Sequence, residues 1–166
     1  MKLGLAALVA LGITAAPAAA IEMTFPLTFT GAEEVPGPGD SDGTATGTIT
    51  FDRDAGTISW NITYNNITTP SAMHIHPGAA GSSGGVFVGL GVATTGGSGT
   101  LISSVNTSQA NIDTILANPT GYYVNIHNAD FGPGAIRAQI PALFQLCFCG
   151  ANEVPGPGDP DGSGMG

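Results

Sequence analysis

The sequence predicts an all-β sandwich or barrel that carries one short helix. The chain has 166 residues, of which 26 are Gly and 12 are Pro, and both residue types favour turns over long helices. Apolar residues occur in short runs with the two-residue alternation of half-buried strands. Many short strands separated by turn residues are typical of sandwiches and barrels.

Seven segments have the composition and alternation of strands. They are residues 23–30, 44–51, 57–64, 72–76, 85–93, 121–127 and 135–140. Residues 52–56 (Asp-Arg-Asp-Ala-Gly) form a predicted turn that joins the second and third strands into a hairpin. Trp60, the single tryptophan, shares its strand face with Ile58 and Ile62, so we expect it in the core.

One segment, residues 108–117 (SQANIDTILA), is predicted to be helical. Thr107 or Ser108 is the expected N-cap, because a hydroxyl there accepts a hydrogen bond from a free backbone N–H. Asn118 and Pro119 follow the segment and are expected to end it.

The first twenty residues have the pattern of a secretory signal peptide. Lys2 precedes an apolar run over residues 3–13, and Ala18, Ala19 and Ala20 form a small-residue cleavage site. The run is shorter than the roughly 20 apolar residues of a membrane-spanning helix. We therefore expect an exported protein, periplasmic or extracellular, without a membrane span.

The remainder is predicted to form one β domain over residues 21–145, followed by a tail. The sequence of residues 27–43 recurs in altered form as residues 146–162. A lone first strand cannot bury an apolar face by itself. We expect residues 146–166 to be the truncated start of a second repeat and largely disordered.

The expected mature chain is strongly acidic. Its basic residues are Arg53 and Arg137, set against twelve Asp and Glu, which leaves a formal charge of about −10. Nucleic acid and anionic lipid both reward clusters of Lys and Arg. The composition therefore argues against nucleic-acid binding.

The chain has three histidines, and strand alternation places all of them opposite apolar faces. In residues 72–76, His74 and His76 share the face opposite Met73 and Ile75. In residues 121–127, His127 lies on the face opposite the apolar alternation, with Tyr123 and Asn125. If the two strands are neighbours, the three imidazoles converge.

Three imidazoles are a ligand set suited to copper or zinc. We therefore predict that His74, His76 and His127 bind one transition metal ion, with affinity falling as pH drops through the ordinary histidine pKa of about 6.5. The alternative is that they are unrelated polar residues. No catalytic residue and no organic cofactor site is predicted, because no Ser-His-Asp order or phosphate-binding loop is present.

Arg137 lies on the polar face of the segment 135–140. We expect a structural role, with the guanidinium paired to a carboxylate such as Asp130.

An ordered set of motifs over residues 27–140 resembles the CHRD domain, first described in chordin and common in exported bacterial proteins. The motifs are Glu34-Val35-Pro36, Thr44-Ala45-Thr46-Gly47, His74-Ile75-His76, Tyr123-Val124-Asn125-Ile126-His127 and Ile136-Arg137-Ala138-Gln139-Ile140. The resemblance implies an immunoglobulin-like, antiparallel Greek-key barrel similar to copper/zinc superoxide dismutase. Ala135 departs from the family, which often has Glu at that position.

Two classes of function are compatible with these observations. The first is an exported binding module that uses the three histidines to hold a metal ion or to meet another extracellular protein. The second is a mononuclear copper redox enzyme resembling superoxide dismutase. A dinuclear copper/zinc site needs more histidines than three, and a shared fold does not by itself imply shared chemistry. The binding module is therefore preferred.

Overall fold

A computed structural model describes residues 22–92, 96–143, 147–149 and 163–165. The elements are β1 (Glu22–Thr30), η1 (Gly31–Glu33), β2 (Thr44–Asp52), β3 (Thr57–Asn65), β4 (Ala72–Pro77), β5 (Val88–Leu90), β6 (Gly99–Asn106), α1 (Gln109–Ala117), η2 (Pro119–Gly121), β7 (Tyr122–His127), β8 (Ile136–Gln139), β9 (Cys147–Cys149) and β10 (Ser163–Met165). Within these residues, no helix has the length and hydropathy needed to cross a membrane.

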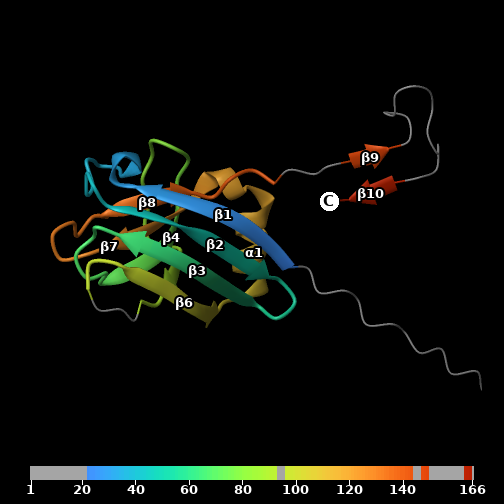
Figure 1. Cartoon of the computed structure of the whole chain (residues 1–166). Coiled ribbons are helices and arrows are strands. Elements are labelled where there is room, and N and C mark those ends of the chain that lie inside the picture. The colour runs from blue at the N-terminus through green and yellow to red at the C-terminus, as the bar shows by residue number, and fades with distance from the viewer. Residues whose placement is uncertain (1–21, 93–95, 144–146, 150–162, 166) are drawn as a thin grey trace, which may run out of the picture.

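Eight antiparallel strands form one strongly curved sheet that nearly closes into a barrel (Figure 1). The strand order is β5-β4-β7-β8-β1-β2-β3-β6, so β5 and β6 are the two edges. Strands far apart in the sequence pair in this order, as β1 does with β8 and β4 with β7. The predicted all-β barrel or sandwich with one helix is confirmed.

The predicted hairpin is formed by β2 and β3, which pair along their whole length. Its turn is stabilised by the Asp52 carboxylate, which accepts a hydrogen bond from the Ala55 N–H at 2.8 Å. Gly56 has a φ of 65°, a conformation that costs glycine little and other residues more. Trp60 on β3 lies in the core, with 4% of its surface exposed.

The predicted strands differ from those of the structure in two places. The segment 85–93 forms a strand only over β5, and β6 was not predicted at all. Its inward positions include Leu101 and Val105, but Ser103 lies between them and opposite Trp60. The polar residue interrupts the apolar alternation, and backbone pairing with β3 compensates for the weak pattern.

The predicted helix is α1, and its N-cap is Ser108. The Ser108 side chain accepts a hydrogen bond from the Asn111 N–H at 3.1 Å. Ile112 and Ile115 of α1 are fully buried in the hydrophobic core. Arg53, in the β2–β3 turn, donates to the Asp113 carboxylate of α1 and thereby ties the helix to that hairpin.

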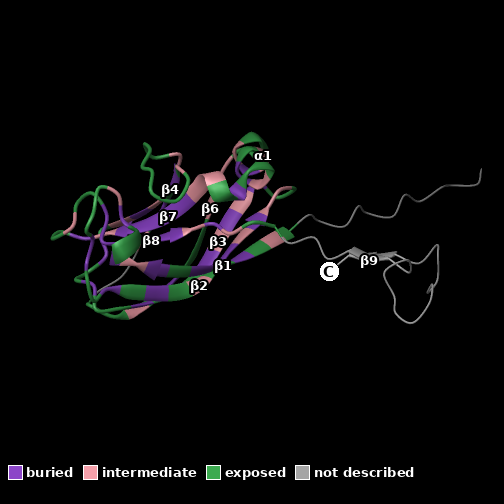
Figure 2. Cartoon of the chain, turned by 90° about the horizontal axis from the view of Figure 1, so that it is seen from above, coloured by how far each residue is buried: buried purple, intermediate pink, exposed green. Residues whose placement is uncertain are grey.

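Much of the polar face of β4, β7 and β8 is buried as well, which strand alternation alone did not predict. Figure 2 shows β7 coloured mostly as buried. Tyr123, Asn125 and Arg137 expose 3%, 1% and 1% of their surfaces. Hydrogen bonds link this face to the β4–β5 and β7–β8 connections, as from Arg137 to Ser82 and from Asn125 to Pro133. The face is polar because it meets loop backbone, whose carbonyl and N–H groups need hydrogen-bond partners.

Two predicted segments lie wholly or partly outside the residues that the structure describes. The predicted signal peptide, residues 1–20, lies outside the described residues, as do residues 150–162 of the predicted tail. The described parts of the tail, β9 and β10, pair with one another in a separate two-stranded sheet.

Candidate metal centre

Pairing between β4 and β7 brings the three histidines together. The antiparallel register places His76 opposite Tyr123, His74 opposite Asn125, and Ala72 opposite His127. His127 is therefore the diagonal neighbour of His74 on the same face of the sheet. Side chains of a diagonal pair on adjacent strands are close enough for their rings to touch. The two strands are therefore neighbours, as the convergence of the three rings requires.

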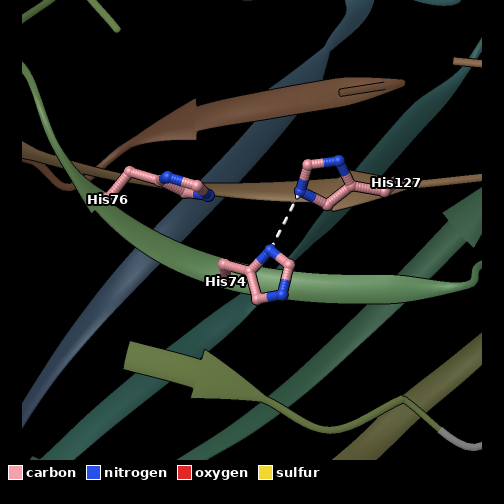
Figure 3. A group of neighbouring side chains, drawn as sticks. All are labelled: His74, His76 and His127. Carbon is pink, nitrogen blue, oxygen red and sulfur yellow. Dashed lines mark hydrogen bonds between the residues drawn. The ribbon is translucent and has the colours of Figure 1, made fainter. Parts of the chain in front are cut away.

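The imidazoles form a compact cluster (Figure 3). One nitrogen from each of His74, His76 and His127 lies within 4.8 Å of the other two. The centroids of the His74 and His127 rings are 4.9 Å apart, and those of His74 and His76 are 5.5 Å apart. His76 is buried, with 6% of its surface exposed, whereas His74 and His127 are half-buried. The cluster therefore has a buried side and a side open to solvent.

Backbone carbonyl groups set the orientation of two of the rings. His76 Nδ1 lies 3.0 Å from the Gly84 carbonyl oxygen, and His127 Nδ1 lies 2.9 Å from that of Gly132. Because a carbonyl oxygen only accepts, both Nδ1 atoms must carry hydrogen. In the neutral rings Nε2 is then the lone-pair nitrogen, which is the arrangement found when a second contact orients a ligating histidine.

The third ring, His74, faces His127 with its Nδ1 atom. His74 Nδ1 lies 3.0 Å from His127 Nε2, as the dashed line in Figure 3 marks. Since His127 Nε2 accepts, His74 Nδ1 donates in the neutral cluster. A metal ion bound here would replace this hydrogen, and His74 would then carry its hydrogen on Nε2.

His76 Nε2 has no hydrogen-bond partner among the described residues although it is inaccessible to solvent. An unsatisfied buried acceptor costs about 1–3 kcal/mol. A bound cation would satisfy this lone pair.

The electrostatics of the cluster favour neutral rings. Burial lowers the pKa of His74, and the neighbouring His127 and His76 lower it further because a second positive ring is repelled. Burial also lowers the pKa of His127, although the hydrogen bond to the Gly132 carbonyl opposes this. Neutral imidazole is the form that binds a metal ion.

The residues fit a single ion after a small rearrangement. Metal–nitrogen bonds of about 2.0–2.1 Å with tetrahedral angles hold the nitrogens about 3.4 Å apart. The 3.0 Å separation of His74 and His127 must open slightly, and the widest separation, up to 4.8 Å, must contract. Three protein ligands leave a fourth position.

The predicted pairing of Arg137 with Asp130 was wrong. Arg137 donates to the carbonyl oxygens of Ser82 at 2.7 Å and Ala79 at 3.0 Å. The Asp130 carboxylate accepts a hydrogen bond from the Thr68 hydroxyl instead. The structural role of Arg137 is supported, because its hydrogen bonds hold the β4–β5 connection against the polar face.

A buried carboxyl group near Arg137 comes from Glu34. Burial raises the pKa of Glu34 to about 7, opposed by the positive charge of Arg137 and by the Asn125 amide. A side chain at Gly134 would collide with the Glu34 carboxyl, so this contact requires glycine. The sequence contained no signal for the contact, because Glu34 and Gly134 are far apart in the sequence and only the fold brings them together.

Sequence reasoning also missed the role of Tyr123. Its ring stacks on that of His76, with centroids 5.1 Å apart and planes 9° apart. Alternation placed both residues on polar faces, but the strand register that makes them partners is a tertiary feature.

Neither the curated proteins nor the solved structures gave a match. The sequence model of the CHRD domain matches residues 25–140, which is more than half of the chain. This range contains the eight-stranded barrel from Phe25 onward and all three clustered histidines. The chain therefore belongs to the CHRD domain family.

Proposed function

We propose that this protein is an exported binding module whose His74, His76 and His127 hold one divalent transition metal ion. The observation that carries the proposal is the convergence of three ring nitrogens within 4.8 Å, two of them oriented by backbone carbonyl groups. The lone pair of His76, buried without a partner among the described residues, supports it. Polar residues without a shared function have no reason to converge in this way on one face of the sheet.

Copper and zinc are the leading candidates. Imidazole nitrogen suits both ions, whereas calcium and magnesium prefer oxygen ligands. The group of clustered ligands in the described residues contains only histidines. The negative charge of the chain, with twelve Asp and Glu, favours the approach of cations from a distance.

Export and partner binding belong to the same proposal. The family occurs in exported proteins, and residues 1–20 have the composition of a signal peptide. A metal ion held at a half-exposed site can stabilise the module, be stored there, or accept a ligand from another extracellular protein.

A mononuclear copper redox enzyme is the second candidate. The observation that favours it is the open side of the cluster, where three protein ligands leave a fourth position for water or a substrate. Protein loaded with one copper per chain is the material to test for superoxide removal. Activity above that of free copper, lost in His127→Ala, would support the enzyme.

The binding proposal is tested by calorimetric titration of untagged protein with copper and with zinc. We expect one ion per chain with a Kd below about 100 μM, equivalent to more than about 5 kcal/mol. His74→Ala, His76→Ala and His127→Ala should each weaken binding at least tenfold, while circular dichroism keeps its β signature. Thr63→Ala, on exposed β3 surface, serves as the control. Absence of binding, or parental affinity in His127→Ala, would refute the metal site.

A further inference from the structure

Tyr123 and Arg137 form a stack that ends on His76. His76 on β4 and Tyr123 on β7 are direct cross-strand partners, and their rings are nearly parallel. The Arg137 guanidinium carbon lies 3.5 Å from the centroid of the Tyr123 ring. Since β4 and β8 flank β7 on opposite sides, the tyrosine is held between the arginine and the histidine. Offset stacking and cation–π contact both favour this geometry.

Arg137 also supports His76 indirectly, through the connection between β4 and β5. Its hydrogen bonds to the carbonyl groups of Ala79 and Ser82 fix this connection. Two residues later, the Gly84 carbonyl accepts the hydrogen of His76 Nδ1 at 3.0 Å. The Gly84 N–H in turn donates to the Tyr123 hydroxyl at 3.4 Å. One arginine therefore supports both the plane of the His76 ring and its hydrogen-bond acceptor.

The three side chains of this arrangement are almost fully buried. His76, Tyr123 and Arg137 expose 6%, 3% and 1% of their surfaces. The contacts are therefore shielded from solvent, unlike those of half-buried His74 and His127. His76 is the histidine whose ring has the least freedom.

We infer that Tyr123 and Arg137 are positioning residues that hold the His76 ring in the plane and tautomer needed for metal binding. The inference rests on the proposed metal site and deepens it, because it assigns the ordering of one ligand to two residues outside the ligand set. Functional geometry must be held to about 0.5 Å and 10–20°. Loss of an outer partner of a metal-ligating histidine lowers metal affinity by about 10–100-fold.

The test compares Tyr123→Leu, Tyr123→Phe and Tyr122→Leu in untagged protein. Tyr123→Leu removes the stacked ring, whereas Tyr123→Phe keeps the ring and loses only the hydroxyl. Tyr122→Leu is the matched control, because Tyr122 is the adjacent residue of the same strand and packs against Phe87 instead. Arg137→Lys keeps the positive charge but loses the planar group and its paired donors.

Two measurements are made on each variant. The first is the ¹⁵N NMR spectrum of the His76 imidazole in metal-free protein, which reports the tautomer and its uniqueness. The second is the Kd for Cu(II), with the EPR spectrum of the complex. In the parent, Tyr123→Phe and Tyr122→Leu, we expect a single Nδ1–H tautomer and copper affinities within about threefold of one another. In Tyr123→Leu we expect averaged tautomers, a changed EPR spectrum and affinity about 10–100-fold weaker.

The outcomes separate the inference from the metal site. Parental tautomer, EPR spectrum and affinity in Tyr123→Leu overturn the inference and leave the metal site intact. Absence of copper binding in the parent overturns both. Equal losses of copper affinity in Tyr123→Leu and Tyr122→Leu indicate general destabilisation and also overturn the inference. If Tyr123→Leu does not fold, the same measurements on Arg137→Lys decide, with parental values overturning the inference.

Discussion

His74 and His127 are joined by a hydrogen bond at the place where a metal ion would bind. The 3.0 Å contact between their nitrogens holds the two half-buried rings together without a metal ion. His76 differs, since its buried Nε2 has no hydrogen-bond partner among the described residues and its ring is held by stacking. The cluster therefore combines one rigid ligand with two that must separate slightly around an ion.

The pH dependence of metal binding follows from the lowered pKa values of His74 and His127. Because burial keeps both pKa values below the ordinary 6.5, these two rings are protonated less than an exposed histidine at the same pH. Affinity should therefore fall less between pH 7.5 and 6.5 than it does for a site made of exposed histidines. This moves the loss of binding to lower pH than the sequence alone predicted.

Zinc titration by calorimetry at about pH 7.5, 6.5 and 5.5 measures this dependence. A peptide carrying His-Ile-His without the fold is the control, and its affinity should already fall clearly between the first two values. A similar early loss in the folded protein would contradict the lowered pKa values.

At the scale of elements, β3 contributes four side chains to the core, namely those of Ile58, Trp60, Ile62 and Tyr64. It pairs along its length with β2 on one side and β6 on the other. Trp60 lies at its middle and lines a cavity of about 200 Å³ together with Leu101 and Val92. Ile102, next to Leu101 on β6, borders the same cavity but exposes 70% of its surface. Alternation along β6 thus separates a core position from a surface position within two residues.

Trp60→Ala should lower the free energy of unfolding by about 3–5 kcal/mol, because it removes a large buried side chain and enlarges an existing cavity. Denaturant unfolding followed by circular dichroism gives the measurement. Ile102→Ala is the control, with an expected loss within about 0.5 kcal/mol for an exposed position. Emission of the native protein at the wavelength of a fully solvated indole, or equal losses in both variants, would show that Trp60 is not packed in the core.

At the scale of the whole molecule, Glu34 connects regions that are distant in the sequence. It follows η1, yet its carboxyl group lies against Gly134 and feels the charge of Arg137 on β8. Burial raises its pKa from about 4.5 to about 7. Between these values the folded protein holds a proton that the unfolded chain has lost, so stability decreases as pH rises through this window.

Glu34→Gln should remove this pH dependence. At pH 8 the parent carries a buried negative charge, and the shift corresponds to a cost of about 3 kcal/mol. We expect the variant to be more stable than the parent by about 1–3 kcal/mol at pH 8, with the difference vanishing near pH 4.5. Urea unfolding of metal-free protein at the two pH values measures it.

Glu33→Gln is the matched control, because Glu33 is the neighbouring residue and is exposed. It should leave the pH dependence of the parent unchanged. A Glu34→Gln variant with the same pH profile as Glu33→Gln would show that the Glu34 carboxyl is not protonated in the folded protein near neutral pH.

The sequence by itself determined the β class, most strands, the helix with its cap, and the grouping of His74, His76 and His127 on polar faces. These features depend on local patterns, namely two-residue alternation, turn residues and a capping hydroxyl. The weak strand β6 was missed, because Ser103 interrupts its apolar alternation and pairing with β3 forms it instead. The family assignment also followed from ordered motifs, since these survive in sequence.

Only the tertiary structure decided which residues surround the histidines. The register of β4 against β7 made Tyr123 the partner of His76 and His127 the diagonal neighbour of His74. The connections that cover the polar face supplied the carbonyl groups of Gly84 and Gly132 and turned Arg137 away from Asp130. Alternation shows which face a side chain occupies, but strand order, register and loop path decide what that face meets.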